Sequence, residues 1–248
     1  MIEEEKINFL VVGAQKSGTS ALDKYLREHS EIEMAPVKEV HYFDNEDNFK
    51  DTANYEAYHK NFTSGHSRIK GECTPIYMYW HPSIKRIFEY NPKIKIIVIL
   101  RNPIERAYSH WNMERDRKAD TVNFTTAIKQ EAIRCREALP FQHRIFSYTD
   151  RGFYSKQIRH IWRFFSKEQT LFIKHDDLKN EPHQVLEELS NFLGISEFSK
   201  VKEKDVYSRP YIGKLSDDDY QYLSDLYFNE IKEIETILNW DCSDWKST

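Results

Sequence analysis

Short apolar runs alternate along the chain with longer segments in which apolar residues recur about every three to four positions. Continuous apolar or β-branched runs at residues 7–12, 94–100 and 170–174 predict buried strands, and a weaker run covers residues 68–72. The periodic segments predict helices at residues 19–29, 82–90, 103–117, 154–165, 182–193 and 216–238. Strands and helices that alternate in this way indicate a parallel sheet covered by helices on both faces.

The composition supports one folded domain. The chain has 248 residues, of which 40% are hydrophobic, and its 15 Tyr, 15 Phe and 5 Trp can fill a sizeable core. It contains no internal repeat, low-complexity tract or linker rich in Pro and Gly. We therefore expect residues 1–248 to form a single α/β domain with a central parallel sheet flanked by helices.

Charge, cysteines and the N-terminal sequence exclude several classes of protein. A net charge of −4 makes a general nucleic-acid binder improbable, and any phosphate recognition must be local. Cys73, Cys135 and Cys242 are widely spaced, which indicates neither a disulfide framework nor a zinc site. The apolar run at residues 7–12 is too short for a membrane span or a signal-peptide core, so we expect a soluble cytoplasmic protein without a membrane partner. The oligomeric state stays open.

The first predicted strand leads into the sequence "GAQKSGTSAL", which has the composition of an anion-binding turn. Ligands of parallel sheets bind at the carboxyl ends of the strands. Here Gly13 and Gly18 permit tight turns, the amides of residues 17–20 can point inward at a helix N-terminus, and Lys16 adds a cation. Hydroxyl groups come from Ser17, Thr19 and Ser20. The turn therefore predicts a site for a phosphate or sulfate group.

A second predicted strand end carries similar chemistry. In "VILRNPIERAYSHW", Arg101 ends a strand, Pro103 begins a helix and Ser109 follows about two turns later. Two separate anion sites suggest a ligand that is charged at both ends. The ATP or GTP P-loop is the obvious rival, but its pattern has Lys directly after the second Gly, where this chain has Thr19.

A magnesium site is poorly supported by the sequence. Only Asp176 and Asp177, just past the strand at residues 170–174, could bind the ion, and an acidic pair that leads a helix is a more common arrangement. We therefore expect no metal.

These motifs resemble the sulfotransferases that use 3′-phosphoadenosine 5′-phosphosulfate (PAPS). "GAQKSGTSAL" is similar to their 5′-phosphosulfate loop and "VILRNPIERAYSHW" to their 3′-phosphate motif. The resemblance continues through "KEVHYFD", "GECTPIYMY", "RGFYSKQIRHIW" and "NFLGI", over roughly residues 7–240. It implies a P-loop-like sulfotransferase fold with one α/β domain. "KEVHYFD" is especially similar to the heparan sulfate glucosaminyl sulfotransferases and their bacterial relatives.

The resemblance also implies roles for individual residues. The 5′ end of PAPS would be held by Lys16, Ser17, Gly18, Thr19 and Ser20. Arg101 and Ser109 would hold the 3′-phosphate, and Tyr207 and Arg209 in "YSRPYIGK" would lie in a loop that closes over it. Lys16 is also suited to stabilise charge that grows on the bridging oxygen as the sulfuryl group leaves. The product would be adenosine 3′,5′-bisphosphate (PAP).

The acceptor needs a base, and "PVKEVHYFD" supplies the candidates. If this segment is extended, Glu39 and His41 point to one side and Lys38 to the other. The segment resembles the corresponding one of the glucosaminyl sulfotransferases. This resemblance implies that Glu39 is the base and that His41 and Asp44 assist it, whereas the cytosolic hormone-type enzymes use a histidine. Glu39 is our prediction, with His41 as the alternative base and with Lys38 and Asp44 near the acceptor.

The acceptor is less well defined by the sequence. Glu72 in "GECTPIY" matches a family glutamate near the acceptor site, but the family often has a lysine at the next position, where this chain has Cys73. We expect a saccharide or a small metabolite with a hydroxyl or an amine, because the net negative charge argues against a long polyanionic chain. A local strip such as Arg115, Arg117 and Lys118 could still serve a polyanionic acceptor. A P-loop kinase and a nucleotide-binding module without catalysis remain alternatives. If the protein were a kinase, the occurrence of Arg101 together with Ser109 would have no explanation. If it were a binding module without catalysis, the presence of Glu39 would have none.

Overall fold

The computed structural model describes residues 6–63, 68–199 and 213–246. The described residues form two compact units, one within residues 1–100 and 161–206 and the other within residues 101–160 and 207–248. The first unit contains the sheet, and the described part of the second is helical.

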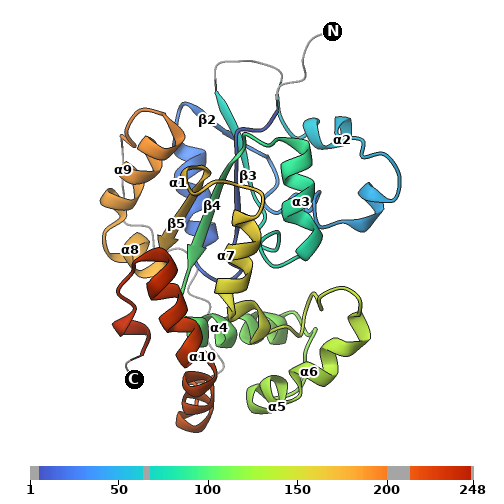
Figure 1. The fold of residues 1–248 in the computed structure, drawn as a ribbon, viewed down its shortest axis with the longest axis vertical. Coiled ribbons are helices and arrows are strands. Elements are labelled where there is room, and N and C mark those ends of the chain that lie inside the picture. Colours follow the sequence, from blue (N-terminus) through green and yellow to red (C-terminus); the bar gives the residue numbers. More distant parts are fainter. Residues whose placement is uncertain (1–5, 64–67, 200–212, 247–248) are drawn as a thin grey trace. The chain divides into compact units, whose positions relative to one another are not determined.

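Within the described residues, the first unit has a five-stranded sheet (Figure 1). Its strands lie in the order β2-β3-β1-β4-β5, and each pair of neighbours is parallel. The predicted α/β fold with a parallel sheet is confirmed. β1 lies between β3 and β4, so the strand order changes direction at β1, where ligands of such sheets usually bind. The strands span Phe9–Gly13 (β1), Ile32–Met34 (β2), Ile69–Cys73 (β3), Lys95–Leu100 (β4) and Thr170–Lys174 (β5).

Both faces of the sheet are covered, as the continuous apolar runs predict. Phe9 and Val11 of β1 belong to a core that also includes side chains of α1, α8 and α9. Leu10 and Val12 alternate with them and are equally buried on the opposite face, the side on which Figure 1 shows α3. The helices of this unit are α1 (Thr19–Glu28), α2 (Glu56–His59), α3 (His81–Tyr90), α8 (His175–Asn180) and α9 (Pro182–Leu193), with the short 3-10 helices η1 (Glu46–Phe49) and η4 (Lys167–Gln169).

The second unit is built around α4 and α10, which pack against each other. α4 begins with Pro103 in its first turn, and the Asn102 side chain caps it by accepting a hydrogen bond from the Ile104 amide at 3.0 Å. The described helices of this unit are α4 (Pro103–Asp116), α5 (Phe124–Lys129), α6 (Glu131–Arg134) and α10 (Asp217–Leu238), with η2 (Cys135–Ala138), η3 (Asp150–Gly152) and η5 (Ser243–Trp245). Helix α7 (Tyr154–Trp162) begins in this unit and ends in the first.

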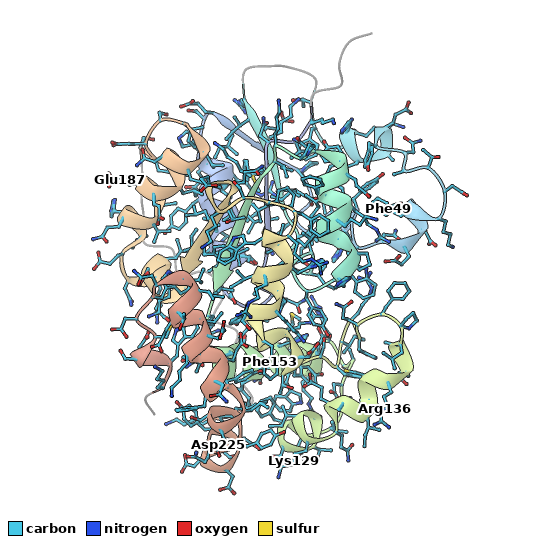
Figure 2. All side chains as sticks on the ribbon, in the orientation of Figure 1. Phe49, Lys129, Arg136, Phe153, Glu187 and Asp225 are labelled. Atoms are coloured by element: carbon cyan, nitrogen blue, oxygen red, sulfur yellow. The ribbon has the colours of Figure 1, made fainter. Side chains whose placement is uncertain are left out.

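Aromatic side chains fix the stretch of the first unit that follows residue 41. The Tyr42 and Tyr58 rings stack with centroids 4.8 Å apart, and Phe43 meets the Tyr58 ring edge-on at 5.0 Å. Further along, the Arg86 guanidinium lies 4.2 Å from the centre of the Phe49 ring, which Figure 2 labels. This packing holds in place the loop that contains the predicted base.

Some elements differ from the sequence-based expectation. β2 was not predicted, because three residues are too few for a recognisable pattern, and α7 ends at Trp162 rather than at residue 165. The helices α2, α5, α6 and α8 also escaped prediction, since each has six residues or fewer. In the described parts of the chain, none of the helices has the length and apolar character needed to cross a membrane.

Candidate active site

The loop between β1 and α1 has the backbone of an anion cradle. Lys16 and Gly18 both adopt the left-handed conformation, with φ values of 71° and 96°. Such residues turn successive amide groups toward one point, and the N-terminus of α1 begins directly after Gly18. Gly18 is the N-cap residue and has no side chain that could occupy the first amides of α1. The Ser17 amide, which was expected to point at the ligand, instead donates to the Ala14 carbonyl at 3.1 Å.

Ser17 gives a second sign that this loop holds a ligand. Its side chain is fully buried, and its hydroxyl oxygen has no hydrogen-bond partner among the described residues. Buried polar groups are normally paired, so a buried hydroxyl without a partner in an anion-binding loop fits a missing phosphate or sulfate oxygen. The predicted loop of residues 16–20 is therefore suited to a phosphate or sulfate group.

His175 is a neighbour of this loop that the sequence analysis missed. A Cβ atom on Gly18 would lie 2.9 Å from Cδ2 of His175, so the imidazole packs directly against the glycine. His175 follows β5 immediately, and Asp176 and Asp177 lie in the first turn of α8, as expected for an acidic pair that leads a helix. The rule that ligands gather at the carboxyl ends of parallel strands could have identified His175.

The loop of residues 38–44 brings four predicted groups together in the first unit. The Lys38 ammonium lies 3.0 Å from Oε1 of Glu39, and Nε2 of His41 lies 3.5 Å from Oε2 of the same carboxylate. On the other side of the ring, Nδ1 of His41 lies 3.0 Å from Oδ2 of Asp44, which is fully buried. Glu39 thus lies between two cations, and His41 lies between two carboxylates.

This geometry corrects one expectation about the loop. The segment is not extended, because Glu39 and His41 have φ values of 64° and 55°. The prediction that Lys38 points away from Glu39 is therefore wrong, and the Lys38 side chain instead turns back to contact it. The expected proximity of Glu39 and His41 holds, although the loop achieves it by turning twice rather than by alternation along a strand.

The electrostatics of the loop set the protonation of the two candidate bases. Burial alone would raise the pKa of Glu39, but hydrogen bonds from His41 and Lys38, together with their charges, lower it to about 2. Hydrogen bonds to Asp44 and Glu39 raise the pKa of His41 to about 9, against the effect of burial. At neutral pH, Glu39 is therefore ionised and His41 carries a proton.

Glu72 lies in the interior of the first unit. Its side chain has no exposed surface, and its carboxylate accepts hydrogen bonds from the hydroxyls of Tyr58, Thr74 and Tyr77. Burial raises the pKa of Glu72 to about 6, and these hydrogen bonds oppose the rise. Glu72, which was predicted to lie near the acceptor, is thus a buried group. The neighbouring Cys73 is also buried, and its thiol donates toward the Thr19 carbonyl at 3.7 Å.

The residues predicted to hold the 3′-phosphate belong to the second unit. Arg101 directly precedes the N-cap of α4, and its Nε donates to Oε2 of Glu105 at 2.9 Å. Ser109 lies two turns into α4 and is buried. Tyr207 and Arg209, the predicted closing residues, lie outside the described residues. No group of three or more His, Cys, Asp or Glu residues that could hold a metal ion occurs in the described part of the chain.

The sequence matches the model of the sulfotransferase domain family over residues 6–234. The chain belongs to this family. Sulfuryl transfer is the chemistry that the family assignment supports, and the kinase alternative is set aside. A crystal structure of a sulfotransferase from Alicyclobacillus acidocaldarius is similar over 98% of this chain and 100% of that chain, with a TM-score of 0.84 and 26% identity.

Two curated relatives extend the comparison to eukaryotic sulfotransferases. The membrane-associated sulfotransferase kil1 of Dictyostelium discoideum is 23% identical over 94% of this chain and 65% of its own length. The human heparan sulfate glucosamine 3-O-sulfotransferase 3B1 is 28% identical over 75% of this chain and 45% of its own length. The chain thus spans less than two thirds of either relative. The resemblance to heparan sulfate sulfotransferases inferred from "KEVHYFD" is confirmed.

The contact of His41 with Asp44 predicts a measurable titration. In Asp44→Asn the pKa of His41 should fall from about 9 toward its ordinary value of 6.5, because the largest cause of the rise is the hydrogen bond to the Asp44 carboxylate. The imidazole shifts can be followed by NMR as the pH is changed. Asp47→Asn is a matched control, since Asp47 is a nearby carboxylate that is 74% exposed and pairs with Lys50. An unchanged titration of His41 in Asp44→Asn would contradict the assigned contact.

The same raised pKa has a consequence for stability. A histidine whose pKa is higher in the folded than in the unfolded protein stabilises the fold fully below its ordinary pKa of 6.5 and loses this effect as the pH rises through about 9. The difference in the free energy of unfolding between the wild type and Asp44→Asn should therefore narrow between these two pH values. Denaturant titrations across this range would measure it.

Proposed function

We propose that this chain transfers the sulfuryl group of PAPS to a hydroxyl or amine of a saccharide or small-metabolite acceptor. The observation that carries the proposal is the loop of residues 16–20, in which left-handed residues Lys16 and Gly18 flank Ser17. The buried Ser17 hydroxyl has no hydrogen-bond partner in the part of the chain that the structure describes. When bound there, PAPS supplies an activated sulfuryl group and a phosphate leaving group. The amides at the start of α1 would orient the 5′ end, and Lys16 would stabilise the charge that develops on the bridging oxygen.

Glu39 is the proposed base because of its protonation state. An acceptor hydroxyl or amine must lose a proton, and at neutral pH Glu39 can accept one whereas His41 already holds its own. A pKa of about 2 makes Glu39 a weak base while both cations contact it. An acceptor that displaces Lys38 from Oε1 would raise the pKa of Glu39 toward its ordinary range and increase its proton affinity. His41, held by Asp44, would then orient the acceptor.

The acceptor class can be tested directly. Labelled PAPS is incubated with the protein and with either extracts of its host or glucosamine, a probe that presents both hydroxyls and an amine. Transfer of label to any acceptor supports catalysis, whereas tight PAP binding without transfer to host extracts would favour a nucleotide-binding module.

Cytoplasmic location remains a prediction and can be tested by fractionation of host cells.

The two proposed phosphate sites predict a difference between nucleotides. PAP should raise the melting temperature of the protein much more than AMP does, because Arg101 and Ser109 would engage only the 3′-phosphate. A ligand at about 100 times its dissociation constant adds about 2.7 kcal/mol to the free energy of unfolding. Thermal unfolding with each nucleotide measures the effect, and Arg101→Ala should reduce the difference. Equal shifts with PAP and AMP in the wild type would contradict the assignment of the 3′-phosphate site.

A further inference from the structure

Glu72 contacts the loop that carries the proposed base. Its fully buried carboxylate accepts hydrogen bonds from the hydroxyls of Tyr58 at 2.8 Å and Tyr77 at 3.0 Å, both on Oε1, and from Thr74 at 2.8 Å on Oε2. The Val40 backbone also lowers the pKa of this carboxylate. Val40 lies between the two candidate bases, so the charge of the buried carboxylate is felt by the backbone that joins them.

Tyr77 extends this network to the other side of His41. Its hydroxyl donates to Glu72 and accepts a hydrogen bond from the Tyr42 amide at 3.0 Å. The backbone directly after His41 is therefore linked to the Glu72 carboxylate through the Tyr77 hydroxyl. A further hydrogen bond fixes the backbone before His41. The Glu39 amide donates at 3.0 Å to the carbonyl of Cys73, the residue directly after Glu72.

The backbone of this loop needs such ties. Glu39 and His41 both have positive φ values, which residues with a Cβ atom adopt only when the surrounding structure imposes them. Without the tethers, the loop would relax toward ordinary dihedral angles. The contact of 3.5 Å between Nε2 of His41 and Oε2 of Glu39 would then be lost.

We propose that Glu72 and Tyr77 are positioning residues for sulfuryl transfer. Glu72 holds the Tyr77 hydroxyl, which holds the backbone directly after His41, and together they keep the His41 and Glu39 side chains facing each other at the acceptor site. This inference rests on the proposed roles of Glu39 and His41. Displacement of a reacting group by about 1 Å can cost about 10²-fold in rate, so a buried network that never contacts substrate can still govern turnover.

Tyr77→Phe and Tyr58→Phe form a matched pair that tests the proposal. Both tyrosines are fully buried, and each substitution removes one hydroxyl that donates to Oε1 of Glu72. Only the Tyr77 hydroxyl also accepts from the amide next to His41. Tyr77→Phe should therefore lower the single-turnover rate of transfer from PAPS to glucosamine, or to an acceptor found in host extracts, about tenfold more than Tyr58→Phe. PAP affinity should be unchanged in both variants.

The titration of His41 provides a readout that does not depend on turnover. Its pKa of about 9 depends on contacts with Asp44 and Glu39, so loosening of the loop should lower the pKa in Tyr77→Phe but not in Tyr58→Phe. NMR would follow the imidazole in each variant, and thermal unfolding would verify that each is folded. If Tyr77→Phe does not fold, Glu72→Gln replaces it, with the same expected fall in rate and in the pKa of His41.

The outcomes separate this inference from the proposed function. Equal rates and equal His41 titrations in the two tyrosine variants would overturn the positioning role and leave a general structural role for the buried hydroxyls. A lowered pKa of His41 in Tyr77→Phe, together with a fully active Glu39→Gln, would support the tethering and overturn Glu39 as base. An inactive Glu39→Gln beside a Tyr77→Phe variant with wild-type rate and titration would overturn the positioning role alone.

Discussion

Glu39→Gln is expected to lower the rate of sulfuryl transfer by about 10² to 10⁴, the usual size of a general-base contribution, while PAP affinity stays unchanged. Glutamine keeps the size of the side chain and a hydrogen-bonding oxygen but cannot take up the proton of the acceptor. In the wild type, the carboxylate is one-third exposed and ionised at neutral pH, so it is accessible and able to accept a proton. Single-turnover transfer from bound PAPS measures the step without interference from product release.

His41→Ala is the comparison that makes this experiment decisive. If His41 only orients the acceptor, its removal should reduce the rate less than Glu39→Gln does. His41 carries a proton at neutral pH, because its pKa lies near 9, which makes it a poor candidate for the base. A nearly active Glu39→Gln beside an inactive His41→Ala would reverse the assignment. PAP affinity, measured for each variant, separates lost chemistry from a folding defect.

Much of the sheet could be predicted because its strands are buried on both faces. β4 and β5 are continuous runs of apolar and β-branched residues, and their predicted limits agree with the observed ones to within one residue. Helix ends with strong local signals were also predicted well. For example, α9 has Pro182 in its first turn and ends at Leu193, directly before Gly194, which adopts φ 76°. Here the local sequence alone determines the structure.

The loop of residues 38–44 could not be predicted in the same way. The sequence predicted that Glu39, His41 and Asp44 act together at the acceptor site. In the structure, His41 contacts both carboxylates. However, no local rule assigns left-handed backbone to Glu39 and His41, because residues with a Cβ atom rarely adopt it. Their conformation depends on hydrogen bonds to β3 and to the residues after it, which come together only in the folded chain.

Glu72 shows a second limit of local patterns. A glutamate in a sequence is expected at the surface, yet this one is buried because hydroxyls from Tyr58, Thr74 and Tyr77 surround it. Tyr58 is distant in the chain, and nothing in the sequence indicates that its hydroxyl meets the carboxylate. The anion-binding loop, in contrast, consists of consecutive residues, so its composition and its place after a strand were sufficient to predict it.

Lys16→Ala is expected to lower the single-turnover rate of sulfuryl transfer by about 10² to 10³, with a smaller effect on PAP affinity. Lys16 lies in the turn before α1, and its proposed role is to stabilise charge that appears on the bridging oxygen only as the sulfuryl group leaves. An interaction that is stronger in the transition state than in the bound state affects the rate more than binding. Measurements of both quantities on the same variant therefore distinguish catalysis from positioning.

The backbone at Lys16 requires two further variants. Because Lys16 has φ 71°, a substitution there could alter the loop as well as remove the charge. Lys16→Gly removes the ammonium but suits the left-handed backbone better than Ala does, and Lys16→Arg retains a positive charge. If the ammonium is responsible, Gly and Ala should lower the rate to a similar extent, and Arg should lower it less. Full turnover combined with weaker PAP binding in the Ala and Gly variants would instead mean that Lys16 only positions the nucleotide.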